Sequence, residues 1–571
     1  MTISWCNEPY QGNIVDLIAA PERADLLKKI AADIPEITLN ERQMCDLEML
    51  ATGVFSPLKG FMSRADYESV LDRMQLQNGL LWPIPVCLDI SEMRAKNLEA
   101  GQSLALKDPE GVLLAVLHVA DIWQPDMEKE ASLLFGTTDR SHPGVYYLMN
   151  ISRKQYVGGD LEVITLPIHY DFRKLRMKPS EVRAMFKKLG WQRAAGFHTR
   201  NPIHRPQFEM TVHAMLKVKA NLLILSNAGP SIPRDFDPYT RVRCYREMVR
   251  RYPPDSVLLN VLPLAARMAG PRDAVLHAIV SKNFGCTHFI VGHHHATPDN
   301  LNNGTPYYKG DAAGSLAVTC GKEIGIDILP IEKMLYLPFE DEYRFNSEVP
   351  EGAQTISFTD TDIRKRIRLG RNIPEWVTFP EVMTEIQRSY PPPRKQGFTV
   401  FFTGLSGAGK STLARVLYAR FLEIGDRPVT LLDGDIVRHN LSNELTFSKE
   451  HRDVNVRRIG FVASEITKNR GIAICAPIAP YAATRQEIRA MIEPYGGFTE
   501  VHVSTPIAVC EKRDRKGMYA KARAGMIKGF TGVDDPYESP ETPELRIDTS
   551  AGAPDECVHE VLLFLGQKGF I

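Results

Sequence analysis

Residues 398–412 read FTVFFTGLSGAGKST, an apolar run followed at once by a glycine-rich turn. From Gly404 to Ser411 the turn matches the pattern G-x-x-x-x-G-K-[ST]. The apolar run predicts a buried strand over 398–403, and the apolar residues at helical spacing after the turn predict a helix that begins near Thr412. A strand, this turn and a helix in that order are typical of a phosphate-binding loop, whereas a chance glycine-rich turn is the alternative.

Phosphate chemistry explains each residue type of this turn. Glycines let backbone N–H groups curl around phosphate oxygens at the positive end of a helix. Lys410 adds a point charge toward the β and γ phosphates, and Ser411 can ligate magnesium. We therefore expect ATP and Mg2+ as cofactors, with Ser411 as the metal ligand. The predicted nucleotide-binding residues are Gly404, Ser406, Gly407, Ala408, Gly409, Lys410, Ser411 and Thr412.

Four further apolar runs follow the loop and are separated by helical patterns, at 429–432, 472–476, 500–503 and 545–548. This alternation predicts a C-terminal P-loop NTPase domain with a doubly wound parallel sheet. The preceding stretch SYPPPRKQG at 389–397 contains three prolines, which indicate a linker. We place the C-terminal domain at 396–571.

The rest of the chain is too long for a single hydrophobic core, so we expect an α/β multidomain protein. Residues 1–170 have short apolar runs, many prolines and glycine turns, which favour a β-rich domain. Over 171–330, helical patterns at 179–189 and 272–283 alternate with apolar runs at 222–225 and 289–291, which indicates a second α/β domain. Residues 331–390 then form a small connecting domain.

Composition excludes several functional classes. The 69 Lys and Arg residues balance 69 Asp and Glu, and no long basic run exists, so we expect no nucleic acid partner. We also expect no membrane partner and a cytoplasmic protein, because no apolar run is long enough to cross a bilayer and the start of the chain lacks a secretory signal. The nine cysteines are scattered singly, which favours buried free thiols.

A second polar feature, Asp433-Gly434-Asp435, follows the second predicted strand of the C-terminal domain. Its two carboxylates would lie at the carboxyl edge of the sheet, where ligands bind in such folds. One of them could serve the metal or an acceptor hydroxyl. The alternative is a cap for the following helix, and spacing alone does not decide between the two.

Four ordered blocks of the C-terminal third resemble adenylylsulfate (APS) kinases. They are GLSGAGKS at 404–411, DGDIVR at 433–438, FSKEHRDVN at 447–455 and KARAGMIKGFTG at 521–532. The resemblance implies transfer of the ATP γ-phosphoryl group to the 3′-hydroxyl of adenosine 5′-phosphosulfate (APS). The products would be ADP and 3′-phosphoadenosine 5′-phosphosulfate (PAPS).

The same resemblance assigns roles to single residues. It implies that Asp435 and Lys410 are catalytic and that Lys528 lies on a mobile lid. The implied substrate-binding residues are Arg438, Phe447, Arg452, Asn455, Ile478, Lys528 and Phe530, with the two phenylalanines sandwiching adenine. Ala479 stands where many family members have a serine, which excludes a phosphoserine at that position and leaves direct transfer possible.

Residues 1–390 resemble ATP sulfurylases, which make APS from ATP and sulfate. The matching blocks are TGVFSPLKGFM at 52–62, TRNPIHR at 199–205 and LPLAARMAGPR at 262–272. This implies an N-terminal β-rich, PUA-like domain followed by a Rossmann-like α/β sulfurylase-type domain.

The sulfurylase site departs from the family pattern at two blocks. The first family block reads Gln-Thr-Arg-Asn-Pro-x-His-x-x-His, but here His198 replaces the glutamine and Gln207 the second histidine, while Arg200, Asn201 and His204 are retained. The second reads Gly-Arg-Asp-His-Ala-Gly-Pro, but here it is GHHHATP at 292–298. Gln207 cannot become cationic and a histidine is mostly neutral at pH 7, so we predict weak or absent sulfurylase activity.

Alternatives remain at this point. The triplet His293, His294 and His295 could hold a metal, although a drifted nucleotide pocket is the simpler interpretation. The chain could be a bifunctional enzyme with both activities, or a sulfurylase whose C-terminal domain only senses PAPS; the intact Lys410 and Ser411 argue against the latter. The resemblance further implies a homo-oligomer, either a hexamer or a dimer, with APS and ATP as small-molecule substrates.

Overall fold

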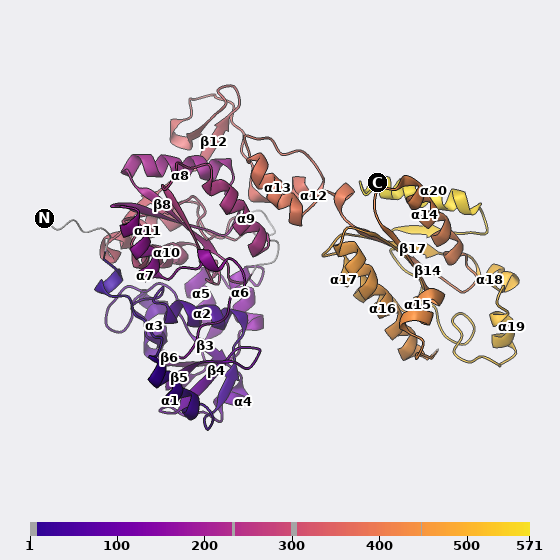
Figure 1. Cartoon of the computed structure of the whole chain (residues 1–571), viewed down its shortest axis with the longest axis horizontal. Helices are drawn as coiled ribbons and strands as arrows, with labels where there is room; N and C mark the ends of the chain where they lie inside the picture. The colour runs from indigo at the N-terminus through magenta and orange to yellow at the C-terminus, as the bar shows by residue number, and fades with distance from the viewer. Residues whose placement is uncertain (1–7, 231–234, 299–304, 447) are drawn as a thin grey trace. The chain divides into compact units, whose positions relative to one another are not determined.

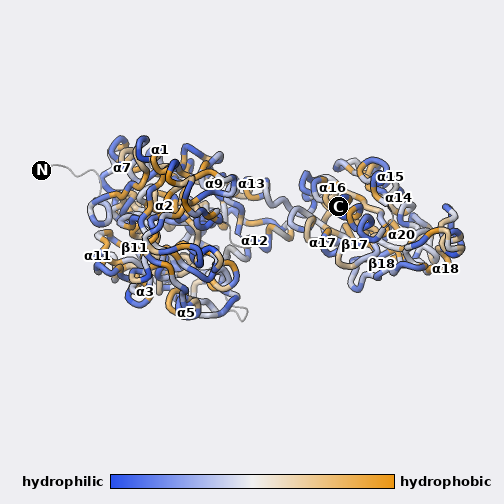
Figure 2. The backbone as a smooth tube through the Cα atoms, turned by 90° about the horizontal axis from the view of Figure 1, so that it is seen from below, coloured by the Kyte–Doolittle hydropathy of each residue, from blue (hydrophilic) through white to orange (hydrophobic). Residues whose placement is uncertain are grey.

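The computed structural model describes residues 8–230, 235–298, 305–446 and 448–571 (Figure 1). The chain forms two compact units, which are described separately. The first comprises Met1–Phe358 and Pro374–Ile386, and the second comprises Thr359–Ile373 and Gln387–Ile571. In both units, hydrophobic segments gather in the interior and much of the outer trace is hydrophilic (Figure 2).

The first unit begins with a six-stranded mixed sheet in the order β1-β4-β5-β6-β2, with β3 paired to β6. Its strands are β1 (Glu36–Thr38), β2 (Gly60–Phe61), β3 (Leu88–Ile90), β4 (Ser103–Lys107), β5 (Leu113–Trp123) and β6 (Gln155–Val163). Its helices are α1 (Pro21–Ile30), α2 (Glu41–Ala51), α3 (Arg64–Arg73), α4 (Glu92–Ala95), α5 (Met127–Phe135) and α6 (Pro143–Tyr146). Most strand pairs are antiparallel, which confirms the predicted β-rich N-terminal part.

A five-stranded, wholly parallel sheet follows in the order β11-β10-β7-β8-β9. Its strands are β7 (Ala194–Thr199), β8 (Asn221–Asn227), β9 (Val257–Leu262), β10 (His288–Val291) and β11 (Asp327–Pro330). Its helices are α7 (Pro179–Lys188), α8 (Arg205–Val218), α9 (Pro238–Val249), α10 (Pro271–Asn283) and α11 (Ala312–Ile324). The predicted elements in this region are all present, with ends that differ by one or two residues.

The segment after this sheet contains the antiparallel pair β12 (Met334–Leu337) and β13 (Glu342–Phe345). Tyr336 of β12 stacks on Trp376 with ring centroids 4.3 Å apart, which ties the pair to the chain that leads into α13 (Pro380–Ser389). Helix α12 (Asp360–Arg368) belongs to the second unit. The domain boundaries at 170, 330 and 390 stay predictions.

The second unit contains a five-stranded parallel sheet in the order β15-β16-β14-β17-β18. Its strands are β14 (Phe398–Thr403), β15 (Val429–Asp433), β16 (Ile472–Ala476), β17 (Gly497–Val503) and β18 (Leu545–Ile547). Its remaining helices are α14 (Lys410–Ile424), α15 (Gly434–Leu441), α16 (Lys449–Lys468), α17 (Ala482–Ile492), α18 (Ile507–Arg513), α19 (Met518–Arg523) and α20 (Pro554–Gln567). All five predicted strands are present, which confirms the parallel sheet.

Alternating side chains of β14 serve the two faces of this sheet. Phe398 and Phe402 pack with residues of α14 and α20 on one face, whereas Phe401 packs with residues of α16 and α17 on the other. Both faces are therefore buried, as expected for a parallel sheet. The loop at the carboxyl end of β14 is held between these two layers of helices.

Candidate active site

The glycine-rich turn connects β14 to α14, and its backbone explains its glycines. Gly404 has φ +150°, and a Cβ atom there would lie 2.5 Å from the Val503 carbonyl oxygen. Gly409, at φ +108°, is the N-cap of α14. Within the described part of the chain no side chain caps this helix, so its first N–H groups remain available to a ligand. The helix begins at Lys410, two residues before the position predicted near Thr412, because Lys410 and Ser411 already have helical geometry.

Side chains from distant segments brace the turn. The Thr549 hydroxyl donates to the Ala408 carbonyl oxygen at 2.7 Å, and the Thr505 hydroxyl donates to the same oxygen at 3.0 Å. The Tyr519 hydroxyl donates to the Ser406 carbonyl oxygen at 2.9 Å. These bonds hold the Ala408 and Ser406 carbonyl oxygens in place and so stabilise the conformation of the loop.

Lys410 is buried inside the turn. Its Nζ donates to the carbonyl oxygens of Gly404, at 2.9 Å, and Leu405, at 2.8 Å. The ammonium group is therefore held at the mouth of the loop, beside the first turn of α14. A phosphate group on the loop would meet a fixed positive charge there.

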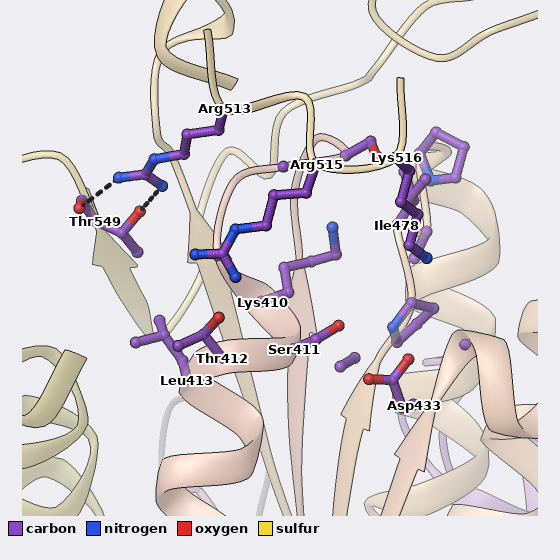
Figure 3. Close-up of a pocket in the computed structure, with 18 of the residues that line it drawn as sticks. Lys410, Ser411, Thr412, Leu413, Asp433, Ile478, Arg513, Arg515, Lys516 and Thr549 are labelled. Atoms are coloured by element: carbon purple, nitrogen blue, oxygen red, sulfur yellow. Dashed lines mark hydrogen bonds between the residues drawn. The ribbon is translucent and has the colours of Figure 1, made fainter. Parts of the chain in front are cut away.

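The turn opens into a cavity of about 540 Å³ (Figure 3). Predicted residues that line it come from four separate segments: Ser406, Gly407, Gly409, Lys410, Ser411 and Thr412, with Arg438, Arg452, Asn455 and Ile478. Asp433, at the end of β15, also lines it. Gly404 and Ala408 are not among the described residues that line the cavity, although they belong to the loop.

The far side of the cavity carries arginine and amide groups. Arg452 forms an ion pair with Asp535 at 3.0 Å and donates to the hydroxyls of Thr531, at 2.8 Å, and Tyr481, at 3.1 Å. Asn455 is buried, and its Oδ1 has no hydrogen-bond partner within the described ranges. Both line the cavity: the Asn455 amide oxygen can accept a hydrogen bond from a ligand hydroxyl, and the Arg452 guanidinium, although paired with Asp535, places positive charge there.

Four predicted residues are not placed in the cavity. Asp435 lies in α15, but its side chain is outside what the structure describes, and Phe447 lies outside the described residues. Phe530 packs edge-on against Tyr519, with ring centroids 5.0 Å apart, and Lys528 is exposed. Neither Phe530 nor Lys528 is among the described residues that line the cavity. The predicted adenine sandwich and lid stay predictions.

A group of cavity residues from the segments around α18, α19 and β18 was not predicted from the sequence. Arg513, Arg515, Lys516, Tyr519 and Thr549 all line the cavity. The Arg513 guanidinium donates to the Thr549 hydroxyl, at 2.7 Å, and carbonyl oxygen, at 2.9 Å, as the dashed lines in Figure 3 show. The charged run at 513–516 could have suggested a binding role. It lies far from the turn in the sequence, so no local pattern connects the two.

The sulfurylase-type positions in the first unit form a cluster of buried histidines. The rings of His198 and His277 stack at 4.3 Å, and His277 Nδ1 lies 2.8 Å from His295 Nε2. Burial lowers the pKa of His295 to about 4, and burial together with the neighbouring histidines lowers the pKa of His198 and His277 well below their usual range. These side chains are therefore neutral at pH 7. His277, inside the buried helix α10, was not predicted.

Other residues of this region are engaged in internal bonds. Arg200 pairs with Asp235 at 2.6 Å, and His204 Nδ1 lies 2.9 Å from the Thr378 hydroxyl. The Gln207 side chain accepts a hydrogen bond from the His204 N–H, at 3.1 Å, and so caps α8. These three side chains are therefore used by the fold, whereas both ring nitrogens of the buried His198 have no hydrogen-bond partner among the described residues.

The histidine triplet at 293–295 is divided between surface and core. His293 and His294 are exposed and contact each other edge-on, with centroids 4.2 Å apart, while His295 joins the buried cluster. The Asn201 carbonyl oxygen accepts a bond from the Tyr245 hydroxyl at 2.8 Å. Across the described ranges, no three His, Cys, Asp or Glu side chains are arranged to hold a metal ion.

Comparison with known proteins identifies each part of the chain. Family models match as a PUA-like domain over 7–166, ATP-sulfurylase over 173–389 and adenylylsulphate kinase over 396–548. The sulfate adenylyltransferase of Phaeosphaeria nodorum is 46% identical over 99% of both chains, and that of Aspergillus oryzae is 45% identical over 99% of both. A solved structure described as a hexameric APS kinase from Thiobacillus denitrificans is 41% identical, with TM-score 0.80, over 99% of this chain and 100% of its own. No helix among the described residues is long and apolar enough to span a membrane.

Proposed function

Because this chain belongs to the sulfate adenylyltransferase (ATP sulfurylase) family and ends in an APS kinase domain, we propose that it phosphorylates APS with MgATP and that its sulfurylase-like body is catalytically inactive. The products are ADP and PAPS. The observation that carries the proposal is the single cavity onto which the phosphate loop, Arg438, Arg452 and Asn455 all open.

Positioning and charge do most of the chemistry in phosphoryl transfer. The N–H groups of the loop and Lys410 hold the β and γ phosphates. Ser411 would hold Mg2+, which would supply neutralisation of charge on the transferred group. Arg438, Arg452 and Asn455 hold the phosphosulfate and ribose of APS so that its 3′-hydroxyl faces the γ phosphorus. Asp433 or Asp435, at the carboxyl edge of the sheet, accepts the hydroxyl proton. Ile478 already lines the cavity, and Lys528 and Phe530 complete the APS site when the lid closes, with Phe447 as the predicted other face of the adenine sandwich.

Loss of the sulfurylase reaction follows from charge. Attack of sulfate on the α phosphorus brings two anions together, so the site needs positive groups. Here His198 and His295 are buried and neutral, Gln207 caps a helix, and Arg200 is paired with Asp235. Removal of one preorganised donor costs about 10²- to 10³-fold in rate, and several positions are altered at once.

A bifunctional enzyme is the second candidate. It is favoured by one observation: relatives that match along the full chain are named sulfate adenylyltransferase. The full-length structural relative is described as a hexameric APS kinase, which favours the first candidate and supports a homo-oligomer here. We place the protein in the cytoplasm, with ATP and APS as its partners and with APS supplied by another sulfurylase.

Two assays on one preparation separate the candidates. The first measures ADP formation from ATP and APS, and the second measures ATP formation from APS and pyrophosphate. We expect activity in the first alone, and Lys410→Ala should lower it by at least about 10²-fold because the phosphate clamp is removed. Vigorous ATP formation in the second assay would establish the bifunctional enzyme instead. No ADP formation in the first assay, or full turnover by Lys410→Ala, would refute the kinase assignment.

A further inference from the structure

The loop between α18 and α19 carries four consecutive charged residues, Arg513 to Lys516, beside the phosphate loop. Two of them are anchors. Arg513 is bound to Thr549 by two hydrogen bonds, and the Asp514 carboxylate accepts bonds from the N–H groups of Met518, at 2.8 Å, and Ala520, at 3.0 Å. The loop backbone is therefore held firmly on both sides of its centre.

Arg515 directly follows these two anchors and precedes Met518 and Ala520, which Asp514 holds, and its side chain lines the cavity. Its side chain points from the loop toward the first turn of α14, where Lys410 and Thr412 lie (Figure 3). Within the described ranges, the Arg515 guanidinium has no hydrogen bond and no ion pair, unlike that of Arg513. Lys516 lies on the other side of the cavity, near Ile478 (Figure 3).

The chemistry of this position is that of a phosphate contact. The first turn of α14 is where the β and γ phosphates of a nucleoside triphosphate would bind, and Lys410 is already committed to the mouth of the loop. A guanidinium can bind two phosphate oxygens at once, whereas the compact ammonium of Lys410 acts as a point charge. In phosphoryl transfer, an added arginine stabilises the charge that spreads over the transferred group.

We infer that Arg515 is a second phosphate-binding cation of this site, which contacts the terminal phosphates of the bound nucleoside triphosphate opposite Lys410. The inference rests on the proposed kinase function for its effect on turnover. Its effect on nucleotide binding is independent of that function. Because Arg515 is exposed and partly screened by solvent, the contribution is modest, on the order of tenfold rather than the 10³-fold or more of a fully enclosed arginine.

The kinetic test compares Arg515→Ala, Arg515→Lys and the control Lys512→Ala. Lys512 is an exposed cation of α18, three residues away, and among the described residues it adds nothing to the cavity lining. We expect kcat/KM for ATP to fall about tenfold in Arg515→Ala, to recover partly in Arg515→Lys, and to change less than twofold in Lys512→Ala. The KM for APS should stay within about twofold in all three. Equal losses in Arg515→Ala and Lys512→Ala would overturn the inference, since only the general field of the loop would then matter.

A binding test without APS separates this inference from the kinase function. Calorimetry should show ATP binding weakened about tenfold by Arg515→Ala, with AMP binding unchanged, because AMP lacks the β and γ phosphates. An equal loss for ATP and AMP would indicate a contact to the base or ribose and would overturn the inference, as would unchanged ATP affinity. Should the wild-type protein bind ATP but never phosphorylate APS, the kinase proposal would fail while the binding result still decides the role of Arg515.

Discussion

The buried histidines of the first unit predict that this unit loses stability in mild acid. Burial lowers the pKa of His295 to about 4, against 6.5 for the group in solution. The folded state therefore binds fewer protons than the unfolded state below pH 6.5, so the stabilisation is fully present above pH 6.5 and is lost as the pH falls toward 4. At pH 5 the loss from His295 alone is about 2 kcal/mol. His198 and His277 act in the same direction, but the three share contacts and do not add.

Tryptophan fluorescence reports on the first unit alone. The five tryptophans are Trp5, Trp82, Trp123, Trp191 and Trp376, and all belong to that unit. Urea unfolding followed by this signal at pH 7 and pH 5 therefore measures the stability of the sulfurylase-like body, whatever happens to the kinase domain.

Other groups in the unit titrate in the same range, so a variant is needed. Burial raises the pKa of Glu130 to about 7 and that of Asp273 to about 6, so these carboxyls favour the folded state as the pH falls and mask part of the effect. The wild-type protein is therefore compared with His295→Gln. We expect the pH 7 to pH 5 loss of unfolding free energy to be smaller in the variant by about 2 kcal/mol. Equal pH dependence in the two proteins would show that His295 protonates freely in the folded state and would refute the buried, neutral cluster.

Three further predictions concern single contacts. Gly404→Ala should lower ATP turnover more than about 10²-fold, because its Cβ would lie 2.5 Å from the Val503 carbonyl oxygen, and the tryptophan unfolding curve should not move; normal turnover would contradict the loop geometry. Arg452→Ala should raise the KM for APS at least about tenfold and should expose the kinase domain to proteolysis, since Asp535 keeps a partly buried charge without its arginine; an unchanged KM would remove Arg452 from the substrate site. Gln207→Ala should destabilise the first unit by about 1 kcal/mol in urea, because the cap of α8 is lost; no change would mean that water replaces the cap at no cost.

Local sequence patterns predicted the parallel sheet of the kinase domain and the position of its phosphate loop. The five strands are apolar runs bounded by turn residues, and the loop is a continuous motif, so both are encoded within short windows. Thr549 and Arg515 could not be found in this way, because they lie more than 100 residues after the turn and reach it only through the fold of the chain. Gln207 was predictable in principle, since a Gln three residues after the N-cap residue, here His204, matches the second half of the capping pattern. His277 carried no signal, because a histidine inside an apolar helical pattern resembles any core residue.

The two units differ in what their polar groups are used for. In the kinase cavity, neither the Asn455 Oδ1 nor the Arg515 guanidinium has a hydrogen-bond partner among the described residues. Both can therefore bind a ligand without breaking a bond of the fold. In the sulfurylase-like region, the retained Arg200 and His204 and the substituted Gln207 are bonded to Asp235, Thr378 and the start of α8. An anionic substrate would have to break those bonds and also protonate histidines whose burial disfavours charge. A substitution that restores one cation, such as His293→Arg, supplies charge at the exposed rim but leaves the neutral interior unchanged. The proposed loss of sulfurylase activity would therefore lie in the packing of the site as a whole rather than in any one missing residue.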